Sequence, residues 1–126
     1  MVRYFDDIRT DESRAFQVYL ILIGLAYERK IATYGMIADL LGFKGAGTLA
    51  RILGHIIIWC EANDLPRLTV LVVNQETGLP GEGIGELSDL DAQREQVFQF
   101  NWFSLVPPTP EELDASYQTV LKGKSA

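Results

Sequence analysis

The sequence predicts a small α+β protein, in which a bundle of about five helices packs with a sheet of two or three short strands. Three observations predict this fold class. Apolar residues recur at helical spacing over most of residues 11–62. A β-branched apolar run at 68–73 is typical of a buried strand. Helical patterns then resume after residue 88 and again after Pro110.

The chain is predicted to form a single domain over residues 1–126. This length is too short for two well-buried cores, and 48% hydrophobic with 22% charged residues is typical of globular chains. We assign residues 11–85 to the core of the domain and residues 86–126 to a C-terminal helical extension. Residues 122–126 are expected to form a loose tail.

Three features predict a cytoplasmic protein. The N-terminus carries Asp6 and Asp7 and lacks the apolar segment of a signal peptide. The longest strongly apolar run, 18–27, is far shorter than the roughly 20 residues that a membrane span needs. Cys60 is the only cysteine, so no internal disulfide can form. We therefore expect no membrane partner.

The first helix is predicted over residues 11–30. Asp11 or Ser13 can cap its start, and Arg29 and Lys30 suit its C-terminal end, where cations interact favourably with the helix dipole. Its apolar residues follow helical spacing and place this helix at the centre of the core. They include Phe16, Tyr19, Leu20, Ile23 and Tyr27.

A second, short helix is predicted over residues 34–41. Thr33 can cap its start, and Gly42 ends it. Its apolar residues are expected to face inward; they are Ile37, Leu40 and Leu41.

The third helix follows a glycine-rich connector at 43–47, which a tight turn between helices requires. Thr48 can cap this helix, which is predicted to run to about Ala62 before Pro66. Two helices joined in this way are typical of a helix-turn-helix.

The strand predicted at 68–73 leads into a turn at 74–78. The chain then returns through 79–85, but Pro80 and three glycines make this segment a poor strand. We predict that it forms an irregular wing.

The C-terminal third is predicted to contain two more helices. One begins at Ser88 or Asp89 and runs to about Phe100. The aromatic segment 101–106 forms either a short strand or a packed extension, and the final helix begins at Pro110 with a good cap.

The charge distribution is uneven. A net charge of −6 argues against a general nucleic-acid binder, because neutralising phosphates requires clustered Lys and Arg. Between residues 29 and 60, however, four cations and one carboxylate give a net charge of +3, so the rest of the chain carries −9. This basic segment coincides with the predicted helix-turn-helix. Chance clustering of solvated side chains would give the same pattern.

Three segments of this region resemble a known family. Residues 33–38 look like a Tyr-Gly-x-x-Ala helix, 50–54 like an Ala-Arg-x-x-Gly recognition helix, and 63–66 like an Asn-Pro-x-Pro turn. These motifs are similar to those of the DNA-binding half of alkylguanine DNA alkyltransferases and of the catalytically inert alkyltransferase-like proteins. The resemblance covers about residues 31–83 and implies a winged helix-turn-helix fold.

The resemblance also implies a mode of DNA binding. In that family the recognition helix enters the minor groove of double-stranded DNA, its Arg stands in for an extruded nucleotide, and the Tyr crowds the target phosphate. The matching positions are Arg51 and Tyr34. The full predicted DNA-binding set is Tyr34, Lys44, Gly47, Thr48, Arg51 and His55.

Each of these residues also has a plainer interpretation. Arg51 could be an ordinary exposed helix residue, and Tyr34 could simply pack the start of its helix. His55 shares a helical face with Arg51, but a lone His is more often partly buried and hydrogen-bonded. Lys44 could be a solvated side chain in the connector.

The active-site residues of this family are missing from the chain. Where it has Pro-Cys-His-Arg, this chain has Leu68-Thr69-Val70-Leu71, so alkyl transfer to a thiolate is excluded. Cys60 lies within a predicted helix among apolar residues, where a thiol is expected to be buried and inert. One His and one Cys do not match zinc spacing. We expect no enzymatic activity, no cofactor and no metal.

Two functional hypotheses follow. The first is non-enzymatic DNA binding of the alkyltransferase-like type, with recognition of distorted or modified DNA implied by the resemblance alone. The alternative is a protein-interaction module, such as an immunity, inhibitor or adaptor protein, whose acidic surface docks onto a basic protein partner.

Overall fold

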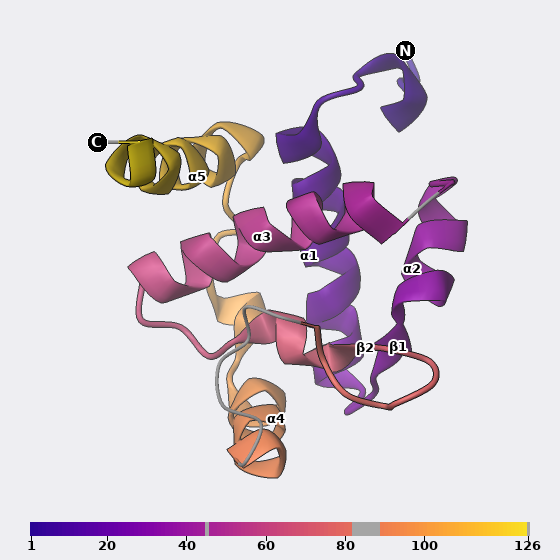
Figure 1. Cartoon of the computed structure of the whole chain (residues 1–126), viewed down its shortest axis with the longest axis vertical. Helices are drawn as coiled ribbons and strands as arrows, with labels where there is room; N and C mark the ends of the chain where they lie inside the picture. The colour runs from indigo at the N-terminus through magenta and orange to yellow at the C-terminus, as the bar shows by residue number, and fades with distance from the viewer. Residues whose placement is uncertain (45, 82–88, 126) are drawn as a thin grey trace.

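The computed structural model describes residues 1–44, 46–81 and 89–125 (Figure 1). These residues form α-helices α1 (Asp11–Tyr27), α2 (Tyr34–Leu41), α3 (Ala46–Ala62), α4 (Leu90–Gln99) and α5 (Pro110–Ser125). Two strands, β1 (Ala32–Thr33) and β2 (Val72–Val73), and short 3₁₀ turns complete the described chain. A mostly helical chain with one small sheet confirms the α+β class.

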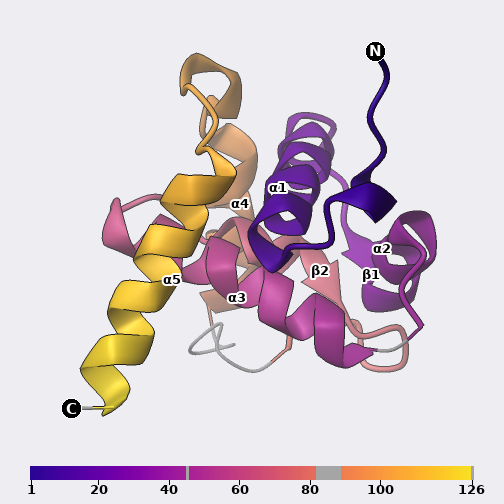
Figure 2. The ribbon, with the colours of Figure 1, turned by 90° about the horizontal axis from the view of Figure 1, so that it is seen from above.

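Helix α1 lies at the centre of the molecule. Its buried face packs against α3, which crosses it, and against α5, which in turn crosses α3 (Figures 1 and 2). Thr10, rather than Asp11 or Ser13, caps the helix, because its hydroxyl accepts a hydrogen bond from the Ser13 amide. The helix also ends earlier than predicted. Arg29 adopts a left-handed φ of 58°, which stops the helical hydrogen-bond pattern.

The two helices of the predicted helix-turn-helix are present. Thr33 caps α2 by accepting a hydrogen bond from the Met36 amide at 3.1 Å, and Gly42 ends it with a φ of 77°. Helix α3 begins at Ala46, so the prediction that Thr48 caps it is wrong. Thr48 instead lies in the first turn of the helix. The predicted end at Ala62 is confirmed.

The sheet is smaller than the apolar run 68–73 predicted. Strands β1 and β2 are parallel, with Ala32 opposite Val72 and Thr33 opposite Val73. Leu68–Leu71 form a buried 3₁₀ turn, in which the Val70 amide donates to the Arg67 carbonyl at 3.0 Å. Because β1 offers only two residues for pairing, β2 cannot extend further.

The turn predicted at 74–78 is confirmed. The Asn74 amide donates to the Leu79 carbonyl and the Gly78 amide to the Asn74 carbonyl, both at 2.8 Å. Pro80 then forms an antiparallel bridge with Val73. Of the predicted wing, residues 79–81 are described, whereas residues 82–88 and the predicted cap at Ser88 lie outside the described residues.

The C-terminal segment packs across the core. Residues Trp102–Ser104 form a 3₁₀ turn, so 101–106 is the packed extension rather than the strand. Thr109 and Glu112 cap α5 reciprocally, each side chain accepting from the other's amide. The helix runs to Ser125, so residues 122–125 of the predicted tail are helical.

Buried aromatic rings join these elements. Tyr19 of α1 meets Trp59 of α3 and Trp102 edge-to-face, with ring centroids 5.6 and 6.4 Å apart. The Trp102 indole also donates to the Val97 carbonyl at 2.8 Å, which ties the 3₁₀ turn to α4. Among the described helices, none is long and apolar enough to cross a membrane.

Candidate nucleic-acid interface

The N-terminal half of α3 is open to solvent. Gly47, Ala50 and Arg51 are exposed there, and a Cβ placed at Gly47 would meet nothing within 4 Å. Further along the helix α5 crosses it, so that a Cβ at Gly54 would already lie 3.7 Å from a ring carbon of Tyr117. The exposed ridge of α3 therefore comprises only its first turns. We call residues 47–51 the α3 ridge.

Arg51 is tethered on this ridge without being buried. Its side chain is 55% exposed, and its Nε donates to Oδ2 of Asp11 at 3.2 Å. The hydrogen bond to Asp11, and then the charge of this carboxylate, raise the pKa of Arg51. The Asp11 side chain is itself 38% exposed. Because exposed ion pairs contribute little to stability, another anion can displace Asp11.

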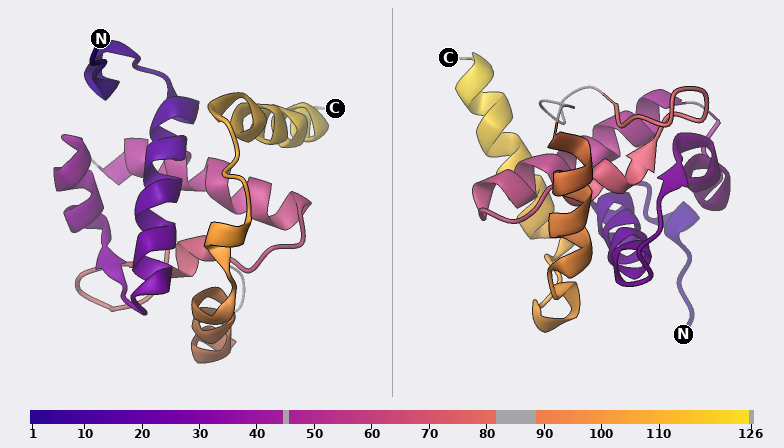
Figure 3. Two further views of the ribbon diagram at one scale, coloured as in Figure 1. Left: turned by 180° about the vertical axis from the view of Figure 1, so that it is seen from behind. Right: turned by 90° about the horizontal axis from the view of Figure 1, so that it is seen from below.

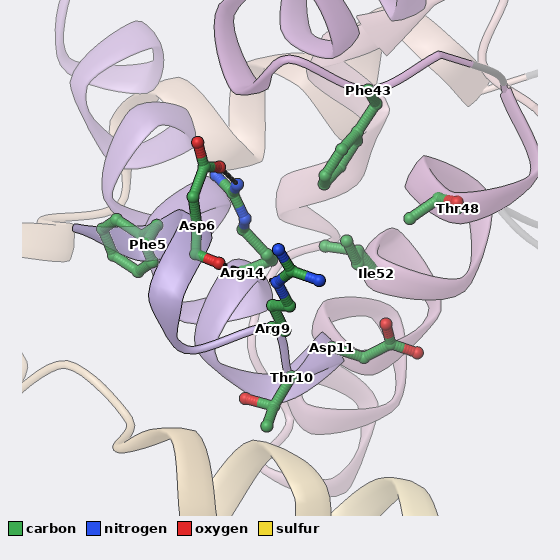
Figure 4. A pocket seen from close by; sticks show the side chains of 9 residues that line it. All are labelled: Phe5, Asp6, Arg9, Thr10, Asp11, Arg14, Phe43, Thr48 and Ile52. Carbon is green, nitrogen blue, oxygen red and sulfur yellow. Dashed lines mark hydrogen bonds and ion pairs between the residues drawn. The ribbon is translucent and has the colours of Figure 1, made fainter.

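Two other predicted contacts lie beside the ridge. Lys44 is exposed in the connector before α3, where its ammonium group can reach an approaching phosphate. Thr48 is half-buried and lines a pocket of about 330 Å³ beneath the ridge (Figure 4). The pocket lies between the N-terminal segment, the first turn of α1 and the start of α3. Its lining residues are Phe5, Asp6, Arg9, Thr10, Asp11, Arg14, Phe43, Thr48 and Ile52.

The cation deepest in this pocket is already paired. Arg14 is 14% exposed and binds Asp6 at 2.8 Å and the side-chain oxygen of Gln17 at 2.9 Å. Its guanidinium also lies 5.5 Å from the ring centre of Phe5 and 5.3 Å from that of Phe43. These contacts hold the N-terminal segment against α1 and the connector, so Arg14 has a structural role.

Tyr34 packs against the chain that follows β2. A Cβ at Gly81 would overlap the Tyr34 hydroxyl, so any larger residue at this position requires the Tyr34 side chain to shift. The ring is half-buried, and the residue also lines a groove with Gly35 and the turn residues Asn74, Gln75 and Glu76. The packing interpretation of Tyr34 therefore accounts for the position of its hydroxyl.

His55 does not lie on the exposed face, so its prediction as a DNA contact is wrong. Its side chain is buried, and its Nδ1 lies 2.8 Å from the Arg51 carbonyl oxygen. The ring stacks on Tyr117 of α5 with centroids 3.8 Å apart and planes 2° from parallel. Spacing of four residues does place Arg51 and His55 on one side of α3, but α5 covers the second position.

The sequence did not reveal two features of this region. Asp11 meets Arg51 across forty positions of sequence, which no local pattern encodes. Leu40 was expected to face inward but is 69% exposed, and Met36 beside it is 61% exposed. These two side chains line an apolar groove between α1 and α2. The sequence signal for this groove was that Met36 and Leu40 give the short helix at 34–41 a second apolar face.

The described residues contain no evident catalytic centre. Burial raises the pKa of the Cys60 thiol to about 12, so almost no thiolate forms at neutral pH. Thr69 is buried, and its hydroxyl has no hydrogen-bond partner in the described chain. Within the same residues, no three His, Cys, Asp or Glu side chains gather as metal ligands.

Comparisons with protein-family models, with curated proteins and with solved structures found no significant match to this chain. Its function is therefore inferred from its own surface.

Proposed function

We propose that this protein binds double-stranded DNA without enzymatic activity, in the manner of an alkyltransferase-like protein, through the α3 ridge. The observation that carries the proposal is the exposed guanidinium of Arg51 on the open first turns of a helix. Gly47 lets a nucleic-acid backbone approach closely on the same ridge. In this proposal α2 serves as the first helix of a helix-turn-helix, and the segment predicted at 79–85 serves as its wing.

The charges of the interface predict weak, salt-sensitive binding. Arg51 and Lys44 are the predicted cations of the interface. Asp11 competes with DNA phosphate for Arg51. Two cations release few counterions, and a net charge of −6 adds long-range repulsion. An intact duplex is therefore a poor ligand. A distorted duplex is a better one, because a mismatched or damaged base costs less to unstack.

The test compares two arginines that are similarly exposed and that each pair with one carboxylate, at different places on the molecule. Arg51 is 55% exposed and paired with Asp11, and Arg29 is 54% exposed and paired with Glu95. They lie near opposite ends of α1, about 25 Å apart along a helix of 17 residues. Replacing either one with Ala makes the same change in net charge and leaves one carboxylate unpaired.

Fluorescence anisotropy with labelled intact, mismatched and abasic duplexes, at low and moderate salt, measures the effect. We expect Arg51→Ala to weaken binding of the abasic duplex by roughly tenfold, and Arg29→Ala to leave it nearly unchanged. The proposal fails if the wild-type protein binds no duplex at low salt. It also fails if the two substitutions weaken binding equally.

A second function is favoured by a separate observation. The exposed side chains of Met36 and Leu40 form part of an apolar groove that the DNA hypothesis does not use. A protein-interaction role, as in an adaptor or inhibitor, would use such a surface.

A further inference from the structure

Helices α1 and α2 enclose an open apolar groove of about 560 Å³. Helix α1 contributes Ile21 and Leu25, and helix α2 contributes Met36 and Leu40. Met36 and Leu40 are both highly exposed, and large exposed apolar side chains that cluster in one groove often mark a binding site. The groove is thus a candidate for binding a ligand or a partner.

The apolar surface continues from the groove across α1. Leu20 and Tyr27 are exposed on this helix, and the Tyr27 ring meets exposed Phe103 edge-to-face at 5.8 Å. Figure 3 (left) shows α1 at the front of this side, with α2 on one flank and the segment that carries Phe103 on the other. The surface is therefore broad enough for an element that lies along or across α1.

Gly24 lies on the same side of α1, one turn from both Leu20 and Tyr27. A Cβ at Gly24 would meet nothing within 4 Å, so no described neighbour requires glycine here. Glycine inside a helix lowers helix stability. Its missing side chain allows the backbone of another helix to come close.

Among the described residues that line the groove, Asp39 is the one with a charged side chain. Asp39 is exposed and forms no ion pair with the described residues. Glu28 and Lys30, which follow the end of α1, form an ion pair at 3.2 Å, so their charges neutralise each other. An occupant of the groove that presents a cation would find Asp39 available.

We propose that this groove binds an amphipathic helix of a partner protein, with apolar anchors at i, i+3 or i+4, and i+7, and with a Lys or Arg that pairs with Asp39. A groove between two helices accepts a third helix, whose anchors repeat at the helical period. A second copy of this chain fits less well, because each copy would bring a net charge of −6 and an Asp39 to the contact.

The described residues that line the groove belong to α1, β1 and α2, and none belongs to α3, which carries Arg51. In Figure 1 α3 passes in front of α1, whereas the rear view in Figure 3 (left) has α1 in front of α3. The partner helix can therefore dock without covering Arg51, and the inference does not depend on DNA binding.

The probe is a displayed library of helical 14-residue peptides, randomised at the four candidate anchor positions i, i+3, i+4 and i+7 and at one neighbouring position for the charged residue. We expect selection on the wild-type protein to enrich apolar anchors together with Lys or Arg at the charged position. Binding of the selected peptides should weaken at least tenfold with Leu40→Gln. It should stay unchanged with Val106→Gln, which alters an exposed apolar residue outside the groove.

Charge reversal tests the pairing with Asp39 directly. The Asp39→Lys variant should no longer bind the selected basic peptides. It should instead bind versions of these peptides in which the Lys or Arg is replaced with Glu. The proposal is overturned if selection yields no binder or if Leu40→Gln and Val106→Gln change peptide binding equally. It is also overturned if Asp39→Lys leaves peptide binding unchanged. It is also overturned if sedimentation equilibrium reveals a dimer that Leu40→Gln abolishes, because the occupant is then a second copy. DNA titration of Leu40→Gln should match the wild type, so failure of either proposal is recognised separately.

Discussion

At the scale of single residues, the hydroxyl of Tyr19 is one of the unsatisfied polar groups in the described core. The side chain is fully buried, and its oxygen has no hydrogen-bond partner. Burial, and then the neighbouring Cys60, raise the pKa of Tyr19 to about 12. The aromatic ring stabilises the core through Trp59 and Trp102, whereas the hydroxyl loses its hydration and gains no partner.

Tyr19→Phe should therefore increase stability, because it removes the unpaired hydroxyl and keeps the ring. We expect the free energy of unfolding to rise by about 1 kcal/mol in urea denaturation, with an unchanged m-value. Trp102→Phe is the matched contrast. It removes an indole that does donate, to the Val97 carbonyl, and should be destabilising. A loss of stability in Tyr19→Phe would mean that the hydroxyl has a partner.

The two buried acids also predict how stability depends on pH. Folding raises the pKa of Cys60 from 9.0 and that of Tyr19 from 10.0, both to about 12. Above pH 9 the unfolded chain releases these protons while the folded chain retains them, so the free energy of unfolding falls as pH rises. Each group contributes a slope of up to about 1.4 kcal/mol per pH unit, until the pH reaches its folded pKa.

Urea denaturation at pH 8.5, 9.5 and 10.5 measures this decline. Cys60→Ala removes one of the two groups, so its stability should fall less steeply across the same range, even if it starts lower because of the cavity. Parallel slopes for the variant and the wild type would contradict a buried, protonated thiol.

At the scale of elements, the start of α2 and the segment after β2 are joined by one close approach. The Tyr34 hydroxyl occupies the space that a side chain at position 81 would need. The contact adds to the parallel pairing of β1 with β2, which precede these two segments. Helix α2 and the first residues of the predicted wing are thereby held together.

Gly81→Ala should destabilise the protein by about 1–3 kcal/mol, because the new methyl group overlaps the phenol oxygen. Tyr34→Phe removes that oxygen, so the penalty of Gly81→Ala should be smaller in a Tyr34→Phe background. A double-mutant cycle in urea denaturation measures the coupling. Additive effects would show that the ring moves away at little cost.

Local signals in the sequence predicted some elements well and others poorly, for physical reasons. Thr33 and Gly42 act within one turn of α2, and both ends of that helix were predicted from them. The 3₁₀ turn at Leu68–Leu71 was missed because a continuous apolar run has no periodicity that separates a strand from a buried turn. His55 was misplaced because α5, which covers it, lies more than fifty residues further along the chain.

At the scale of the whole molecule, a net charge of −6 opposes the DNA binding that we propose. The proposed answer is local: one carboxylate, Asp11, controls the exposed cation of the α3 ridge. Glu95 pairs in the same way with Arg29, near the other end of α1. Local and global charge can therefore be separated with two substitutions.

Asp11→Asn should tighten binding of the abasic duplex several-fold, because it frees Arg51 to meet phosphate. Glu95→Gln makes the same change in net charge, from −6 to about −5, but frees Arg29 instead, and should have little effect. Anisotropy titrations at two salt concentrations compare the two variants. Equal tightening would mean that total charge, rather than the ridge, governs association.

The seclusion of Cys60 has a practical consequence. The single thiol of the chain is buried in α3, so the thiol of an introduced, exposed cysteine is the one that reacts readily with a labelling reagent. Arg51→Cys would accept a fluorophore or a photocrosslinker on the ridge, and Leu40→Cys would accept the same reagent in the groove. Both faces can thus be labelled one at a time, in a background that keeps its native core.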